Sequence, residues 1–167
     1  MKLVSGRLPA EATRERGADV LRVPPPLYFG AAFGGGMLLH EVTMPLAIAG
    51  GQATGVVGSV VLGAGAALCL AAVASVLRHH TTIVPHRAAS RLLTSGAYRI
   101  SRNPMYAGLA AAYFGGALLA GSWWPLATLP VALAVVGNLV IGPEESYLAG
   151  HFGQAYRDYQ TRVRRWL

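Results

Sequence analysis

Residues 103–145 read "NPMYAGLAAAYFGGALLAGSWWPLATLPVALAVVGNLVIGPEE", two apolar runs joined by a short turn that contains Trp123 and Trp124. A helix needs ~20 residues to cross the hydrocarbon core of a bilayer, and the runs at residues 104–121 and 125–142 just reach this length. Tryptophan is typical of the boundary between lipid and water. The stretch therefore predicts two antiparallel membrane helices with their turn at one membrane surface.

Two further apolar runs, at residues 27–50 and 54–77, come earlier and are separated by Gly50 and Gly51. The chain of 167 residues is 53% hydrophobic and only 13% charged, whereas soluble domains carry roughly a quarter charged residues. We therefore predict an all-α integral membrane fold of four transmembrane helices in two hairpins, followed by an amphipathic cytoplasmic helix. The predicted single domain has an N-terminal cytoplasmic arm (1–25), a first hairpin (26–77), a cytoplasmic loop (78–103), a second hairpin (104–142) and a C-terminal helix (143–167).

The basic residues predict the orientation. All 14 Lys and Arg residues lie before the first run, between the second and third, or after the fourth, and the two short turns carry none. Because cytoplasmic segments of membrane proteins are enriched in Lys and Arg, both termini and the long middle loop are predicted to be cytoplasmic, in a multi-pass protein of the inner (plasma) membrane. The net charge of +7 then reflects topology and attraction to anionic lipid headgroups. Basic residues spread in this way do not indicate nucleic-acid binding.

Polar residues gather where the third run begins, in "SGAYRISRNPMYAG", residues 95–108. Asn103 and Pro104 suit the start of a helix, as cap and first helical residue. Capping leaves the surplus of arginine and tyrosine unexplained, namely Tyr98, Arg99, Arg102 and Tyr106.

Glu144 and Glu145 follow the fourth run directly, and the chain has seven acidic residues in all. If the last two runs form an antiparallel pair, these carboxylates lie within roughly one helix spacing, ~10 Å, of the arginines before the third run. We therefore predict a cluster of arginine and glutamate at the cytoplasmic boundary. Beyond it, apolar residues recur at steps of three or four and predict one face of an amphipathic helix, formed by Leu148, Phe152, Tyr156, Tyr159, Val163 and Trp166.

These motifs resemble the isoprenylcysteine carboxyl methyltransferase/phospholipid methyltransferase superfamily. Its pattern has a Gly-x-Tyr, an Arg-His/Asn-Pro-x-Tyr, a helical hairpin, a Glu-Glu-x-x-Leu and a Phe-Gly-x-x-Tyr-x-x-Tyr. The corresponding segments here are residues 96–98, 102–106, 144–148 and 152–159, and the match covers about 75 residues. The resemblance implies S-adenosylmethionine as the methyl donor, bound at the cytoplasmic side between the last hairpin and the C-terminal helix.

The resemblance also implies which residues form the site. It gives Arg102 and Glu145 catalytic roles and implies a donor-binding set of Gly96, Tyr98, Arg99, Arg102, Asn103, Pro104, Tyr106, Glu144, Glu145, Leu148 and Tyr156. The chemistry is consistent, because arginine binds a carboxylate bidentately and carboxylates accept from an ammonium or a ribose hydroxyl. No strand followed by a glycine fingerprint occurs, so a soluble Rossmann-type methyltransferase is excluded.

Two departures from the family pattern bear on the acceptor. Asn103 stands where members that methylate prenylcysteine have His, and Asn cannot act as a base; Ala97 replaces the usual Pro. The acceptor therefore stays open among a lipid carboxylate, a phospholipid amine and a small hydrophobic thiol. Expected partners are S-adenosylmethionine or its product S-adenosylhomocysteine, a hydrophobic acceptor and the bilayer. Small residues in the second run suit close helix packing or a homodimer face, as at Gly58, Gly63 and Gly65.

Two other functions compete with methyl transfer. His40 and Glu41 lie in or near the end of the first run, and ionisable residues inside a membrane suggest function, here a proton-coupled transporter. Sterol reductases resemble the family in their last hairpin and bind NADPH, whose 2′-phosphate the loop arginines could contact.

The histidines at 79, 80 and 86 are irregularly spaced and lack an accompanying carboxylate, so no metal site is predicted. The lone Cys69 gives no disulfide.

Overall fold

The computed structural model describes residues 23–78 and 92–167, and helices make up nearly all of the regular structure in these ranges. The first 22 residues and residues 79–91, which include the three loop histidines, lie outside the described part. The only pairing between extended segments in the described ranges is a single β-bridge between Ala47 and Ser122. The elements are α2 (Pro25–Val42), α3 (Gln52–Arg78), η1 (Gly96–Arg99), α4 (Pro104–Leu119), α5 (Trp123–Val136), η2 (Gly137–Ile141), α6 (Gly142–Phe152) and α7 (Gln154–Arg162).

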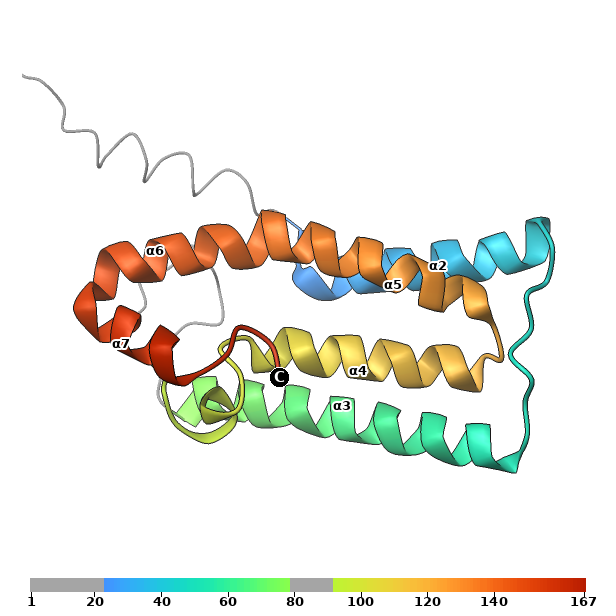
Figure 1. Ribbon diagram of the computed structural model, residues 1–167, viewed down its shortest axis with the longest axis horizontal. Helices are drawn as coiled ribbons and strands as arrows, with labels where there is room; N and C mark the ends of the chain where they lie inside the picture. The colour runs from blue at the N-terminus through green and yellow to red at the C-terminus, as the bar shows by residue number, and fades with distance from the viewer. Residues whose placement is uncertain (1–22, 79–91) are drawn as a thin grey trace, which may run out of the picture.

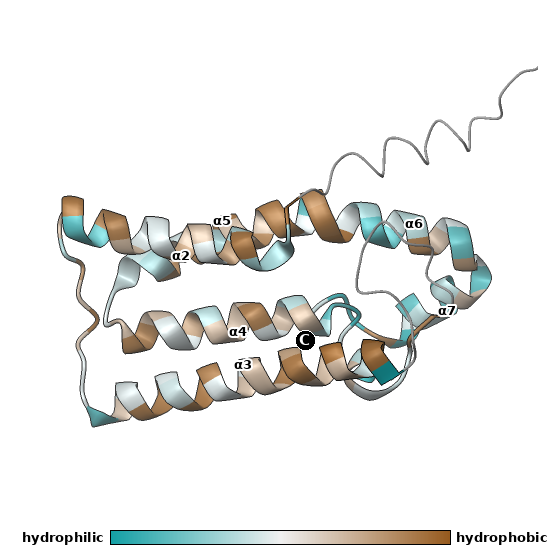
Figure 2. Cartoon of the chain, turned by 180° about the vertical axis from the view of Figure 1, so that it is seen from behind, coloured by the Kyte–Doolittle hydropathy of each residue, from teal (hydrophilic) through white to brown (hydrophobic). Residues whose placement is uncertain are grey.

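The helices form two layers, with α2 packed along α5 and α3 packed along α4 (Figure 1). Two helices of the described residues are long and apolar enough to cross a membrane, Gln52–Arg78 and the continuous helix Trp123–Phe152, and the apolar α4 is shorter. The hydrophilic residues concentrate around α6 and α7 at one end of the bundle (Figure 2). The elements of the described ranges are thus all helices, as predicted. The polar end of the bundle lies opposite the α4–α5 turn (Figure 2).

The predicted first hairpin is wrong in its packing, because α3 lies against α4 rather than against α2. α2 ends at Val42, and residues 43–51 cross the end of the bundle instead of forming a two-glycine turn. Pro45 cannot donate a backbone hydrogen bond, so it disfavours continuation of the helix. The crossing segment instead bonds to the α4–α5 turn: the Ile48 N–H donates to Gly121 O at 2.8 Å and the Trp123 N–H to Leu46 O at 2.9 Å.

Close contact between α3 and α4 depends on small residues. Gly65 of α3 is buried, and a Cβ added there would lie 2.6 Å from the carbonyl oxygen of Gly108 on α4. Gly58 and Gly115 repeat the arrangement nearer the other end, with the Gly58 carbonyl 2.6 Å from a Cβ added at Gly115. Gly63 of the same helix has open space instead. Close packing on α4 thus explains the small residue at Gly58 and at Gly65, two of the positions predicted to form a small-residue face.

Aromatic side chains fill the space between the layers. The buried core contains Phe29 of α2, Tyr113 of α4 and Val136 of α5, and the two rings meet edge to face. The Tyr113 hydroxyl and the Thr128 hydroxyl are 2.7 Å apart, and the Thr128 hydroxyl donates to Ala32 O at 3.0 Å. These contacts fix α2, α4 and α5 relative to one another.

The helix that begins at Trp123 does not stop at Gly142, where the fourth run was predicted to end. It passes through the π-turn η2 and continues as α6 to Phe152, giving 30 helical residues. Pro143 has no N–H and cannot make the regular α-helical bond, and the wider turn, closed by the bond from Gly142 N–H to Gly137 O, lets the helix continue past it. Glu144 and Glu145 are therefore carried on the same continuous helix as α5.

The predicted C-terminal helix of residues 143–167 is divided in the structure. Gly153 takes a positive φ of 54°, a conformation that glycine adopts without steric cost, and the chain turns back as α7. α7 ends at Arg162, and residues 163–167, which we call the C-terminal strap, have no regular secondary structure and run toward the start of α4 (Figure 1). The apolar face predicted for the C-terminal helix is confirmed in part, because Tyr156 and Tyr159 are buried.

The glycine contact between α3 and α4 gives a direct test of this packing. Gly65→Ala forces a methyl group against the α4 backbone, so we expect a loss of about 1–3 kcal/mol in the free energy of unfolding, seen as a lower melting temperature in detergent. Gly63→Ala adds the same methyl group to the same helix in open space and serves as control. Equal melting temperatures for the two variants would contradict the packing of α3 on α4.

Candidate functional site at the polar end of the bundle

A short loop before α4 forms one side of the site. Gly96 has a positive φ of 61°, and residues 96–99 form the one-turn helix η1. Pro104 is the first residue of α4, as predicted, and Asn103 occupies the cap position. The Asn103 side chain does not cap, contrary to prediction. Its Nδ2 donates to the carbonyl oxygen of Arg165 at 3.1 Å, because the C-terminal strap lies directly beside it.

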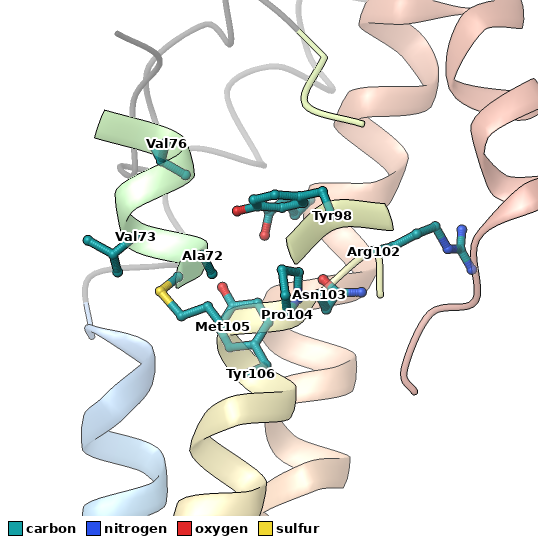
Figure 3. Close-up of a pocket in the computed structure, with 10 residues that line it drawn as sticks. Ala72, Val73, Val76, Tyr98, Arg102, Asn103, Pro104, Met105 and Tyr106 are labelled. Atoms are coloured by element: carbon teal, nitrogen blue, oxygen red, sulfur yellow. The ribbon is translucent and has the colours of Figure 1, made fainter. Parts of the chain in front are cut away.

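A small pocket lies between this loop, α3 and α6, with a volume of about 60 Å³. Six of the residues proposed from the sequence line it, and Ala72, Val73 and Val76 of α3 form its apolar wall (Figure 3). The α3 contribution was missed, since no motif on that apolar helix distinguishes a pocket wall from a lipid-facing surface. The six predicted residues that line the pocket are Tyr98, Arg102, Asn103, Pro104, Tyr106 and Glu144.

Glu144 meets two tyrosines in this pocket. Its carboxylate interacts with the Tyr106 hydroxyl through a side-chain hydrogen bond. Burial, followed by the nearby charge of Glu144, raises the pKa of Tyr98 to about 12. The Tyr98 hydroxyl is therefore protonated at neutral pH and can donate a hydrogen bond. This side of the site combines one carboxylate with phenolic donors and an apolar wall.

Arginines gather on the other side of the loop. The Arg102 side chain extends away from Tyr98 and Met105 (Figure 3), and its Nη1 lies 3.4 Å from Glu145 Oε1. The second Glu145 oxygen accepts a hydrogen bond from Arg165 Nη2. Glu145, with only 10% of its side chain exposed, thus lies between two guanidinium groups. The predicted cluster of arginine and glutamate is present, and Arg165 is a member that the sequence did not indicate.

Two tyrosines of α7 close this side. Tyr156 is buried and hydrogen bonds with the Arg102 side chain. The Tyr159 hydroxyl donates to the backbone oxygen of Tyr98 at 2.6 Å, and burial raises the pKa of Tyr159. α7 is therefore tied to the η1 loop by both residues.

Some polar atoms of the cluster have no hydrogen-bond partner in the described part of the chain. Arg102 Nε and Glu145 Oε1 are both buried in this state. Buried polar groups are normally paired, and leaving one unpaired costs ~1–3 kcal/mol. An unpartnered guanidinium N–H is well suited to an anionic group such as a carboxylate.

Three predicted site residues lie away from the pocket and the charge cluster. Arg99 is exposed on the outside of η1, and Leu148 is partly buried on α6 without lining the pocket. Gly96 supplies the turn that begins η1 rather than a wall of the pocket. In the described ranges, no group of three or more His, Cys, Asp or Glu residues could hold a metal ion.

An apolar groove of about 700 Å³ lies between α4 and α5 on another side of the molecule. Small side chains of α4 and leucines of α5 form its walls, and residues of the C-terminal strap line it as well. The strap therefore borders both the groove and the charge cluster. The groove is lined by Ala107, Ala110, Ala111, Phe114, Leu129, Leu133, Ala134, Gly137, Asn138, Arg165, Trp166 and Leu167.

The bond from Tyr159 to the Tyr98 carbonyl predicts how α7 is held. Tyr159→Phe removes the hydroxyl and leaves the partly buried carbonyl of Tyr98 without this donor, so we expect a loss of about 1–2 kcal/mol in the free energy of unfolding, measured by thermal unfolding in detergent. Tyr147→Phe is the matched control, because the Tyr147 ring stacks on His151 and keeps that contact without its hydroxyl. Losses of the same size in both variants would argue against the anchoring role of Tyr159.

Comparison with known proteins gives one family. Residues 53–155 match the family model described as phospholipid methyltransferase. A protein of Haemophilus influenzae, described as an uncharacterized protein, is 44% identical over 55 residues, which cover 30% of this chain and 87% of that protein. No solved structure gives a significant match. The family match spans α3 to the start of α7 and includes the pocket together with Arg102 and Glu145, whereas Tyr156 and Arg165 lie beyond it.

Proposed function

The chain belongs to the phospholipid methyltransferase family, and we propose that it transfers a methyl group from S-adenosylmethionine to a lipid-like or small hydrophobic acceptor at the cytoplasmic membrane face. The observation that carries this proposal is the pairing of Arg102 with Glu145, 3.4 Å apart, beside the carboxylate of Glu144. Both signs of charge are thus held at the start of α4 by residues from opposite ends of a helical hairpin.

The charges of this site fit the chemical groups of the donor. S-adenosylmethionine carries a carboxylate, an ammonium and a positively charged sulfonium. The buried, unpartnered Nε of Arg102 suits the carboxylate, and the carboxylate of Glu144 with its tyrosines suits the cationic groups. Val73, Val76 and Met105 offer apolar contact. The enclosed 60 Å³ is far below the ~300–1,000 Å³ of small-molecule sites, so we expect the walls to separate when the donor binds.

Positioning is the main task of the protein in such a reaction. The bound donor supplies an electrophilic methyl group on sulfur, and the acceptor atom attacks this carbon in line as the carbon–sulfur bond breaks. Arg102 would hold the donor, Glu145 would hold Arg102, and the buried tyrosines would exclude water. Fixing two reactants in line supplies much of the catalysis in displacements of this kind. An amine or thiol acceptor must also lose a proton, and Glu144 is the carboxylate of the pocket that can accept it.

A hydrophobic acceptor agrees with the apolar groove between α4 and α5. The groove is large enough for a small ligand, and its walls are alanine, leucine and phenylalanine. Asn103, which stands where a prenylcysteine-specific enzyme has His, is engaged with the strap through its side-chain amide. An asparagine amide is not basic, so Asn103 supplies no base, and Glu144 is the pocket residue that can accept a proton from an amine or thiol acceptor.

The competing functions have weaker support. Glu41 is exposed near the end of α2, next to His40, whose Nδ1 bonds with Ser122 beside the α4–α5 turn. This is the opposite end of the bundle from Glu144 and Glu145 (Figure 1). A reductase would require basic residues for the NADPH 2′-phosphate, and the family match over residues 53–155 is to methyltransferases and gives the reductase no support.

Ligand-dependent stability tests the donor directly. We expect S-adenosylhomocysteine to raise the melting temperature of the detergent-solubilised full chain by several degrees, because a ligand at 100 times its Kd stabilises by ~2.7 kcal/mol. NADPH at equal concentration should have no effect. Arg102→Ala and Glu145→Ala should each lose the shift, and Arg157→Ala, which removes an exposed arginine of α7, should keep it. A shift with NADPH alone would favour the reductase.

The transporter hypothesis is tested at Glu41. Because Glu41 lies far along the bundle from the proposed donor site, we expect Glu41→Gln to retain both the S-adenosylhomocysteine shift and transfer of a radiolabelled methyl group into a lipid extract. Glu144→Gln is the matched variant at the proposed site, and we expect it to lose transfer. If Glu41→Gln abolished transfer while Glu144→Gln retained it, the site would be misplaced.

A further inference from the structure

The C-terminal strap is fixed to the loop before α4 by its backbone. The Arg102 N–H donates to the carbonyl oxygen of Arg164 at 2.8 Å. The carbonyl oxygen of Arg165 accepts two more bonds, from the Ser101 hydroxyl at 3.1 Å and from Asn103 Nδ2 at 3.1 Å. Trp166 packs against the main hydrophobic core. The backbone of Arg165 is therefore held in one place, and its side chain emerges beside Glu145.

Glu145 is shared unequally between its two arginines. Arg165 makes a hydrogen bond to one carboxylate oxygen, whereas Arg102 approaches the other at 3.4 Å without hydrogen-bond geometry. A carboxylate and a guanidinium normally prefer two parallel hydrogen bonds. Arg165 thus hydrogen bonds to one of the two carboxylate oxygens, so Glu145 cannot bind Arg102 through both oxygens. As a result, Arg102 Nε is buried with no hydrogen-bond partner in the described residues.

We propose that Arg165 is a positioning residue, which acts through Glu145 to keep the Arg102 guanidinium available for an anionic group of the methyl donor. This inference rests on the proposed function, which by itself assigns no role to Arg165. Two arginines and one glutamate leave the cluster with one excess positive charge, which the donor carboxylate neutralises. Without Arg165, the excess charge disappears and Glu145 can take both donors of Arg102.

A purely structural role for Arg165 predicts different behaviour. If the ion pair with Glu145 only fastens the strap, its loss should lower the melting temperature and leave the affinity for the donor unchanged in the folded protein. The strap also borders the apolar groove, so an effect on the acceptor must be kept separate. Binding of S-adenosylhomocysteine without acceptor separates donor affinity from fold stability, because it is measured on folded protein. It also separates donor affinity from any effect on the acceptor, because no acceptor is present.

The experiment compares S-adenosylhomocysteine binding by calorimetry to the full chain and its variants in detergent. We expect Arg165→Ala to raise the Kd about tenfold, as for loss of one coupled charged neighbour, and to raise the KM for the donor with kcat nearly unchanged. Arg165→Lys should recover most of the affinity, because it restores the charge beside Glu145. Arg162→Ala is the control, since this exposed side chain bonds within α7, to Asp158 O, and it should bind as the unaltered chain does.

A double-mutant cycle tests whether Arg165 acts through Glu145. Glu145→Gln should weaken binding, and adding Arg165→Ala should then have little further effect, because the neutral amide no longer holds a guanidinium strongly. Additive losses, or unchanged affinity in Arg165→Ala with a lower melting temperature, would overturn the positioning role and leave the proposed function intact. Failure of the unaltered chain to bind S-adenosylhomocysteine would instead overturn the proposed function, and the role of Arg165 with it.

Discussion

The carboxylate of Glu145 sets the strongest physical constraint on the polar end of this protein. A buried charge is costly unless it is paired, and Glu145 is 8% exposed. Its partners come from two segments distant in the sequence, Arg102 before α4 and Arg165 in the C-terminal strap. Satisfying this one carboxylate therefore requires that the α4–α5 hairpin is closed, that α6 continues from α5, and that the chain returns after α7.

Helix continuity positions that carboxylate. Without the π-turn at Gly137–Ile141, Pro143 would tend to break the helix, and the direction of the Glu144–Glu145 pair would depend on a flexible joint. With it, the two carboxylates project from a continuous helix that begins at Trp123. The same helix contributes Val136, Val140 and Ile141 to the hydrophobic core. The packing that stabilises the bundle thus also determines where the acidic residues stand.

The sequence predicted the parts of the structure that depend on local signals. Pro104 as a helix start, a short turn between the last two apolar runs, and the approach of Arg102 to Glu145 all follow from run lengths and adjacent polar residues. The turn itself is residues 120–122, and Trp123 and Trp124, which were predicted to lie in it, begin α5. The extended crossing of residues 43–51 was missed because its backbone bonds are made to the α4–α5 turn, more than 70 residues away in the chain. Side-chain capping by Asn103 failed for the same reason, since a distant carbonyl competes for its amide. Arg165 could be distinguished from its basic neighbours only by tertiary structure.

The backbone of residues 102–104 separates two kinds of chemistry at this end of the bundle. On the α3 side lie Glu144, two tyrosines and an apolar wall. Arg102 lines the same pocket, and its guanidinium extends to the α7 side, where Arg165 and Tyr156 lie. A ligand that spans the divide must present an anion to one side and a cation to the other, which is the charge pattern of an amino-acid group joined to a sulfonium. A nucleotide phosphate satisfies only the arginine side and would meet Glu144 on the other. The proposed methyl donor, which presents a carboxylate together with cationic groups, therefore fits this separation of charge better than the anionic cofactor of a reductase does.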